Sequence, residues 1–277
     1  MPTPPPPPKP DDAPHEAIAG NDAAGLLILC DHATNQVPER YGSLGLPAGE
    51  LERHIGFDPG ARALTFALAE RLGAPALLST YSRLLVDPNR SQDDPTLVMK
   101  LSDGTVVPAN HPITDEEVGR RVERYHAPYH AAVDARLDAM LAAGPPPLVF
   151  SIHSFTPVWR GVPRPWHAAV LWDADPRANV PMVEALRADA SLTVGDNEPY
   201  EGALFGDTIH RHATVRGLSN CLIEVRQDLI GHDAGVEEWA DRFAPILRDL
   251  LNRPEIGAIR HYGSRTDGTA RTEPTHG

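Results

Sequence analysis

The sequence has little cysteine and no long apolar run. Only Cys30 and Cys221 occur among the 277 residues, and both lie inside apolar stretches. Two buried thiols in a reducing compartment are the simpler interpretation, although a single disulfide between them is compatible with the sequence. The longest apolar stretches, such as 25–30 and 148–152, are far shorter than the roughly 20 residues that a membrane span needs. The sequence therefore predicts no membrane partner.

Basic residues are also scarce relative to acidic ones. The chain has 25 Lys and Arg against 38 Asp and Glu, a formal net charge of −13. Such a surface repels phosphate backbones, so we expect no nucleic-acid partner. A secretory signal has an apolar core between a basic start and a cleavage site. The N-terminal residues contain no such core, which argues against a secretory signal. We expect a cytoplasmic protein.

Several catalytic and nucleotide-binding motifs are missing. The sequence contains no phosphate loop GxxxxGK[ST], no GxGxxG and no CxxC. Ser151 and Ser154 lack the GxSxG context of a nucleophile elbow, which disfavours a serine hydrolase.

Proline, in contrast, is abundant at the start of the chain, where eight of the 29 prolines fall within the first 14 residues. Such a segment forms an extended coil that cannot bury a core, although it could bind a proline-recognising partner. We expect a disordered proline-rich tail over 1–18, a single domain over 19–262 and a flexible C-terminal tail over 263–277.

Short apolar runs alternate with amphipathic stretches along the domain. Continuous apolar runs predict strands buried on both faces, and periodicity with capping signals predicts helices. Strands are expected over 25–30, 76–80, 148–152, 168–172 and 220–225, and helices over 59–72, 114–141 and 236–250. Thr114 and Glu117 match a capping box at the start of the second helix. This alternation predicts an α/β fold with a mixed, largely parallel central sheet flanked by helices on both faces.

Two histidines follow expected strands, where ligands bind in such sheets. His32 comes after the first strand and His153 after the third, and imidazole is a common zinc ligand. Asp58, just before a predicted helix, is a candidate third ligand, but a helix N-cap is about equally compatible. Hydrogen-bonded histidines without metal are the alternative for the pair.

Glu224 lies within the apolar strand predicted over 220–225. A carboxylate there either pairs with a cation, such as Arg226 on the same face, or faces a cleft with a raised pKa. The second case suits a general base that takes a proton from an attacking water and returns it to the leaving amine.

Three further pairs of residues are less specific signals. Arg83 and Arg90 are compatible with surface ion pairs or, inside a cleft, with carboxylate binding through the guanidinium fork. His126 and His130 have helical i, i+4 spacing but adjoin no strand end, and we interpret them as structural. His210 and His212 point to different faces of a helix, so at most one faces the site.

Six motifs along the chain, in the same order as in a known family, carry a resemblance to that family. They are CDHATNQVP (30–38), HIGFDPGA (54–61), YSRLLVDPNR (81–90), SIHSF (151–155), GDNEPY (195–200) and HATVRGLSNCLIEVRQDLI (212–230). Over roughly residues 25–251 the sequence resembles the N-formylglutamate amidohydrolase family, whose members look like distant relatives of the zinc carboxypeptidases.

The resemblance implies a zinc-carboxypeptidase-like (phosphorylase/hydrolase-like) fold with one zinc ion per chain. It implies His32 and His153 as zinc ligands, with Asp58 as the third. Asn89 and Arg90 match a pair that holds a substrate carboxylate. Arg83 would bind a second carboxylate or the developing oxyanion, and Glu224 would be the general base.

One position departs from the pattern of zinc carboxypeptidases, which have a glutamate three residues after the first histidine. Here that residue is Asn35, a poor zinc ligand. Asp58 is therefore our choice for the third ligand and Glu39 the second choice. Asp31 is a candidate to orient His32 from behind.

We add Asn35, Arg226 and His212 to the predicted substrate contacts. Trp159 and Trp166 lie in a proline-rich loop that is either a lid or a surface segment.

The resemblance implies hydrolysis of the formyl amide of N-formyl-L-glutamate to formate and glutamate, so the expected partner is a small acidic N-acyl amino acid. The alternatives are a zinc carboxypeptidase or aminoacylase acting on another acidic N-acyl amino acid or peptide, and a non-catalytic module that binds an acidic metabolite. The sequence does not indicate an oligomeric state.

Overall fold

The computed structural model describes residues 4–267, and a seven-stranded sheet in the order β1-β3-β2-β6-β11-β9-β10 forms its centre. β3, β2, β6 and β11 run parallel, β1 is antiparallel to β3, and β9 is antiparallel to β11 but parallel to β10. The mixed, largely parallel sheet predicted from the apolar runs is confirmed. The strands are β1 (His15–Ile18), β2 (Leu26–Cys30), β3 (Ala76–Ser79), β6 (Leu148–Phe155), β9 (Ala168–Leu171), β10 (Val194–Asp196) and β11 (Asn220–Arg226).

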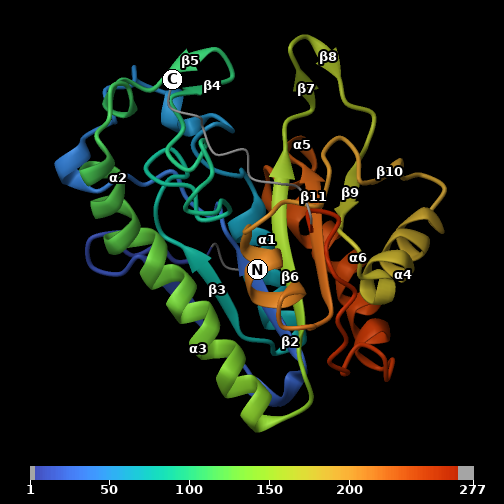
Figure 1. Ribbon diagram of the computed structural model, residues 1–277. Helices are drawn as coiled ribbons and strands as arrows, with labels where there is room; N and C mark the ends of the chain where they lie inside the picture. The colour runs from blue at the N-terminus through green and yellow to red at the C-terminus, as the bar shows by residue number, and fades with distance from the viewer. Residues whose placement is uncertain (1–3, 268–277) are drawn as a thin grey trace.

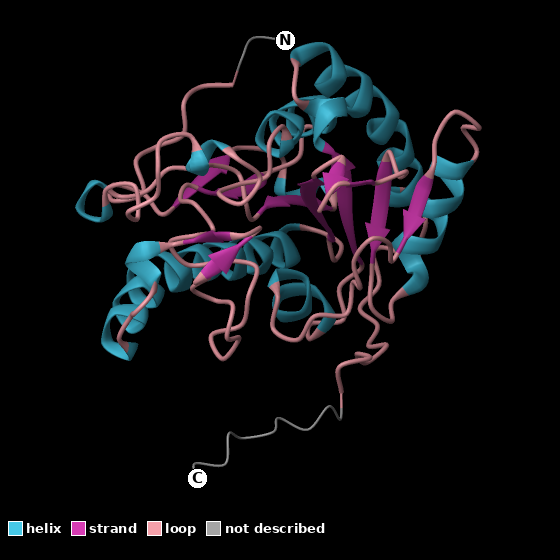
Figure 2. Cartoon of the chain, turned by 90° about the horizontal axis from the view of Figure 1, so that it is seen from above, coloured by secondary structure: helices cyan, strands magenta, loops and turns pink. Residues whose placement is uncertain are grey.

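Helices cover both faces of this sheet, as Figure 2 shows. Side chains alternate along each strand, so Leu26 and Ile28 of β2 face α1 (Ala61–Leu72), α4 (Pro176–Arg187) and α6 (Asp233–Leu251). Leu27 and Leu29 face the opposite side, where α3 (Ala127–Ala143) and the π-helical turn η6 (His210–Thr214) lie. All four leucine and isoleucine side chains are fully buried, which explains why the strand reads as a continuous apolar run. Both cysteines are buried and free.

The second predicted helix forms, but in three contiguous parts: α2 (Asp115–Arg121), the π-helical turn η5 (Val122–His126) and α3. The Thr114 hydroxyl accepts the backbone N–H of Glu117 at 3.2 Å, as expected for a cap. The Glu117 carboxylate, however, accepts from Arg121 (2.9 Å) rather than closing the capping box. Pro128 has no N–H to donate, and the widened π turn ends just before it.

The predicted N-terminal tail needs correction, because its last residues belong to the domain. His15–Ile18 is strand β1, which pairs with β3 in full antiparallel register. Further upstream, Asp11 accepts a hydrogen bond from the Tyr125 hydroxyl at 2.8 Å. At the other end, Arg265 donates its backbone N–H to Asp173 at 2.8 Å, and residues 268–277 of the predicted C-terminal tail lie outside the described part.

The remaining elements are short. Two hairpins project beyond the end of the sheet to which β6 points (Figure 1). None of the helices within residues 4–267 is long and apolar enough to span a membrane. The short elements are η1 (Asp22–Ala24), η2 (Glu39–Tyr41), η3 (Glu50–Glu52), β4 (Leu101–Ser102), β5 (Thr105–Val106), η4 (Pro108–Asn110), β7 (Val158–Trp159), β8 (Val162–Pro163) and α5 (Gln227–Ile230).

Candidate metal centre and substrate cavity

A cavity of about 260 Å³ lies at the carboxyl ends of β2, β6 and β11. This is the edge at which parallel sheets bind ligands, because loops from several strands meet there. Seven residues singled out from the sequence line it: His32, Asp58, Arg83, Asn89, Arg90, His153 and Glu224.

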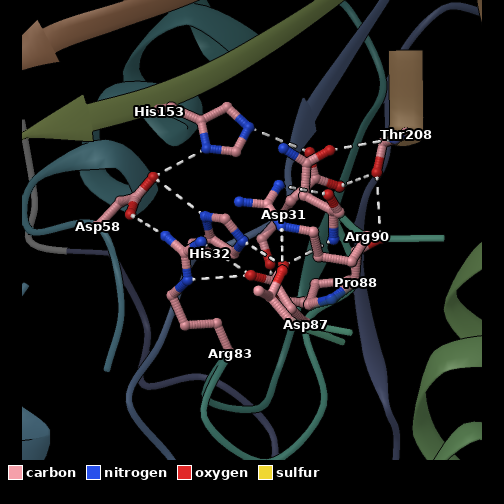
Figure 3. Close-up of polar contacts among 12 residues, drawn as sticks. Asp31, His32, Asp58, Arg83, Asp87, Pro88, Arg90, His153 and Thr208 are labelled. Atoms are coloured by element: carbon pink, nitrogen blue, oxygen red, sulfur yellow. Dashed lines mark hydrogen bonds and ion pairs between the residues drawn. The ribbon is translucent and has the colours of Figure 1, made fainter. Parts of the chain in front are cut away.

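His32, Asp58 and His153 bring three potential ligand atoms together. His153 Nδ1 lies 2.9 Å and His32 Nδ1 3.3 Å from the same Asp58 oxygen, Oδ2. Figure 3 shows both imidazole rings turned toward this carboxylate. All three side chains are buried, and one donor atom from each lies within 4.8 Å of the others. The group is compact enough to hold one metal ion.

A second carboxylate binds the far side of each imidazole. His32 Nε2 lies 2.7 Å from Asp87 Oδ1, and His153 Nε2 lies 3.1 Å from Asp31 Oδ2 (Figure 3). Metal-ligating histidines are commonly oriented in this way, because the outer carboxylate fixes the tautomer and makes the inner nitrogen more basic. The sequence-based idea that Asp31 orients His32 is wrong, since Asp31 orients His153.

Both outer carboxylates are ionised by their surroundings. Asp31 is fully buried, which raises its pKa, but the hydrogen bonds from His153 and Thr208 and the charges of His153 and His32 together lower the pKa to about 2. It also accepts from the hydroxyls of Tyr129 and Thr208, each at 2.8 Å. Burial is likewise outweighed at Asp87, where Arg83 and His32 hold the pKa well below its usual range.

These contacts fit a cation at the point where the three inner atoms converge. If each Nε2–H donates to its outer carboxylate, both Nδ1 atoms carry lone pairs and face the lone pairs of Asp58. Three acceptors at this distance repel one another unless a proton or a metal ion lies between them. Without a metal a proton fulfils this need: burial lowers the pKa of His153, but Asp31 and Asp58 raise it well above its usual range. Two imidazoles and a carboxylate match the donor set that zinc prefers.

Local backbone structure holds Asp58 at this point. Its backbone N–H donates to His32 O at 2.9 Å, and Oδ2 accepts the backbone N–H of Ser154 at 3.2 Å. The N-cap of α1 is Gly60, not Asp58, so the capping interpretation is wrong.

Glu224 lies on β11 directly opposite His153 of β6. Its Oε2 atom is buried and has no hydrogen-bond partner among the described residues. Burial raises its pKa to about 7, although the nearby histidines and Arg83 oppose the shift. The alternative of a Glu224–Arg226 pair is wrong, because Arg226 pairs with Asp228 at 2.8 Å.

The Asp87–Arg90 segment contributes polar groups at another wall of the cavity. Asn89 Oδ1 accepts the backbone N–H of Thr208 at 3.1 Å, which leaves the amide nitrogen to donate to a ligand. Arg90 Nη1 donates to the carbonyl of Asn89 at 3.0 Å. Arg83 donates two bonds to Asp87 Oδ2, at 3.1 and 2.8 Å, and its Nη1 lies 3.8 Å from Asp58 Oδ1.

Four predicted site residues lie outside the cavity. Asn35 and Arg226 do not line it, and His212 is fully buried between His130 and Asp134, at 2.8 Å from each. We therefore withdraw these three as substrate contacts. Glu39 is exposed on η2, which removes it as the second choice for a metal ligand.

The sequence reasoning missed other cavity residues, among them Asp207 and Tyr200. Asp207 is buried, accepts the backbone N–H of His210 at 2.7 Å, and has its pKa raised to about 7, chiefly by burial. Asp87 was also missed as a partner of His32. The sequence pattern that could have indicated Asp87 is an acidic residue that lies between two arginines within residues 82–90. Trp159 and Trp166 do not line the cavity, although the Trp159 ring lies 6.1 Å from that of His54, which does.

Comparisons with known proteins show the family and the fold of this chain. The family model for N-formylglutamate amidohydrolase matches residues 24–231. A protein of known structure from Agrobacterium tumefaciens is 32% identical with a TM-score of 0.80, covering 86% of this chain and 94% of that one. The N-formylglutamate amidohydrolase from Ralstonia eutropha shares the fold, with 22% identity, a TM-score of 0.61 and coverage of 86% and 97%. No significant match was found among the curated proteins. The chain belongs to the N-formylglutamate amidohydrolase family.

Proposed function

We propose that this protein is a zinc-dependent amidohydrolase that hydrolyses the formyl amide of N-formyl-L-glutamate, or of a similar small acidic N-acyl amino acid. The observation that carries the proposal is the presence, in one cavity, of a His–Asp–His group, a buried Glu224 oxygen without a hydrogen-bond partner in the part of the chain that the structure describes, and an Asn–Arg pair. These are the parts that amide hydrolysis of an acidic substrate requires.

His32, Asp58 and His153 would hold the zinc ion, with Asp87 and Asp31 fixing the two imidazoles. The ion would supply Lewis acidity, which polarises the amide carbonyl and lowers the pKa of water. This assignment is supported by the convergence of three acceptor atoms at distances that call for a cation.

Glu224 is the group suited to move the proton. With a pKa of about 7 its carboxyl is poised near neutrality, where a group both accepts and returns protons efficiently. We assign it to take a proton from the attacking water at Oε2 and to deliver that proton to the departing amine nitrogen. The products are then formate and the free amino acid, with every atom of water accounted for.

The arginines suit the charges of an acidic substrate. We assign Asn89 and Arg90 to bind a substrate carboxylate, since an amide and a guanidinium both donate to carboxylate oxygens. Arg83 pairs with Asp87 and lies 3.8 Å from Asp58 Oδ1, beside the His–Asp–His group, and is assigned to the developing oxyanion. A cavity of about 260 Å³ favours a small molecule over a long peptide, since pockets for drug-sized ligands measure roughly 300–1,000 Å³.

Metal content and formate release, measured together, test the proposal. We expect about one zinc ion per purified chain by elemental mass spectrometry, with formate released from N-formylglutamate, and loss of both in His153→Ala. Zinc without formate would refute the substrate, and N-acetyl amino acids and dipeptides would then be tried. No specific metal after zinc reconstitution would refute the metallohydrolase and favour a module that only binds an acidic metabolite.

A further inference from the structure

The Pro88–Arg90 segment has no regular secondary structure, so its backbone must be held by other groups. Two histidines of the helix behind it provide this support. His130 Nε2 lies 3.0 Å from the carbonyl oxygen of Pro88, and His126 Nε2 lies 3.0 Å from that of Arg90. These two carbonyls flank Asn89, the residue assigned to the substrate carboxylate.

The histidine is the hydrogen-bond donor in both contacts, because a carbonyl oxygen can only accept a hydrogen bond. His130 Nε2 and His126 Nε2 must therefore both carry hydrogen. Neutral imidazoles suffice for this, and burial lowers the pKa of both histidines, that of His130 well below its usual range. With Nε2–H donating, the Nδ1 atom of neutral His130 is an acceptor.

His130 is in turn held by a chain of bonds that reaches the surface. Its Nδ1 lies 2.8 Å from Nε2 of His212, which must be the donor, and His212 Nδ1 lies 2.8 Å from Asp134 Oδ1. The His212 side chain is fully buried, whereas the Asp134 side chain is 52% exposed. The ring of His130 also stacks on that of His212 at 5.0 Å and packs against His126 at 4.3 Å. The orientation of His130 is thus fixed on several sides.

The far side of the segment is fixed as well. Asp87 accepts the backbone N–H of Asn89 at 2.9 Å, and Thr208 binds the Asn89 side-chain oxygen. With the Pro88 and Arg90 carbonyls bound to histidines behind the segment, the polar ends of Asn89 and Arg90 are left to line the cavity.

We propose that His126 and His130 are positioning residues that set the Asn89–Arg90 pair for binding a substrate carboxylate, with His212 and Asp134 anchoring His130. The inference rests on the proposed function, since it assigns the pair to a carboxylate. It replaces the purely structural interpretation of these histidines and gives the buried His212 a role away from the cavity.

The test compares two amide replacements of His130. In Gln the amide nitrogen reaches the place of Nε2 and can still donate to Pro88 O. In Asn the amide group reaches only the place of Nδ1, which keeps the contact with His212 but loses Pro88. We expect His130→Asn to raise KM for N-formylglutamate about 5- to 20-fold with kcat within twofold and zinc content unchanged. His130→Gln should stay within twofold of wild type in KM.

A second readout separates positioning from general loosening. N-formylglutamine and N-formylisoglutamine each replace one carboxylate by an amide, and the wild type should discriminate most strongly against the one altered at the Asn89–Arg90 pair. His130→Asn should lose most of this discrimination, as Arg90→Ala should. If both His130 variants only lower Tm and leave KM unchanged, or if Gln and Asn raise KM equally, the proposal is overturned.

Two further arms keep the outcome interpretable. If His130→Asn fails to fold, His126→Asn and His126→Gln repeat the comparison for the Arg90 carbonyl. If the wild type releases no formate, the proposed function fails, and the positioning role is judged by calorimetric binding of L-glutamate to the same variants. Weaker binding by Asn than by Gln would support it. Equal binding by both variants, or no binding by the wild type, would refute it.

Discussion

At the scale of single residues, Glu224 and Arg226 make an informative pair. They stand two positions apart on one face of β11. Glu224 lines the cavity, and its Oε2 has no hydrogen-bond partner within residues 4–267, whereas Arg226 pairs with Asp228. The two side chains share a strand, so substituting either should perturb β11 similarly, whereas only Glu224 is placed to exchange a proton with a substrate.

We expect Glu224→Gln to keep its zinc and fold while kcat falls about 10²- to 10⁴-fold, the usual effect of losing a general base. Arg226→Gln, the matched control, should retain kcat within a few fold. Formate release and zinc content measured on both variants check this. A Glu224→Gln enzyme with wild-type kcat would end the assignment of Glu224 as proton acceptor.

How far sequence reasoning reaches differs between residues of the site. His32, His153 and Glu224 are indicated by the sequence because each lies within or just beyond an apolar run that ends at the ligand-binding edge of the sheet, and Asp58 because it stands just before a predicted helix. The sequence does not indicate that Asp87 contacts His32 or that Asp207 lines the cavity. It also does not indicate that the partner of Asp31 is His153. Their roles depend on loops that meet only after folding, and no local pattern specifies which carboxylate faces which imidazole.

At the scale of elements, the turn from Asp58 to α1 determines where the Asp58 carboxylate lies. Gly60 has φ +84°, and a Cβ atom there would lie 2.3 Å from the backbone oxygen of Ile230. Glycine is needed on both counts, the left-handed backbone and the close approach of another segment.

We expect Gly60→Ala to lower the free energy of unfolding by about 2–4 kcal/mol, combining backbone strain with the displacement of Ile230. It should also weaken zinc retention by shifting Asp58. Gly73→Ala at the other end of α1 is the control. There φ is +61°, but among the described residues no atom beyond the glycine and its two chain neighbours lies within 4 Å of the added Cβ. It should cost about 1 kcal/mol and leave zinc in place. Denaturant unfolding and metal titration would measure both, and equal effects would contradict the argument.

Periodicity predicted most elements well, and its failures have identifiable causes. β6 extends to Phe155 rather than stopping at residue 152. The apolar run ends there because His153 and Ser154 are polar residues that line the cavity, but the backbone continues its pairing with β11. β1 was missed because it has four residues beside a proline-rich segment and is stabilised by pairing with β3, a contact distant in sequence.

At the scale of the whole molecule, the N-terminal segment supplies one edge strand of the sheet. β1 covers the outer edge of β3, and Glu16 pairs with Arg62 of α1 at 2.7 Å. An uncovered β3 would present unpaired backbone groups to other chains, a known route to aggregation.

Deletion of residues 1–18 should therefore lower stability by about 2 kcal/mol or more and cause concentration-dependent aggregation. Deletion of residues 1–6 keeps Asp11 and β1, and should change stability by no more than about 0.5 kcal/mol. Thermal unfolding and light scattering at several protein concentrations would distinguish them. Identical behaviour of the two truncated proteins would mean that β1 contributes little.

The bond between Thr208 and Asp31 has a consequence for how the protein matures. It joins residues 177 positions apart, and the same hydroxyl lies 3.4 Å from the carbonyl oxygen of Pro88. Contacts this distant in sequence form late, because the conformational entropy of closing the long intervening loop is lost before the contact contributes any stabilising energy. Helices and individual strands can therefore assemble while the cavity is still open. Enzymatic competence should be among the last properties a newly synthesised chain acquires.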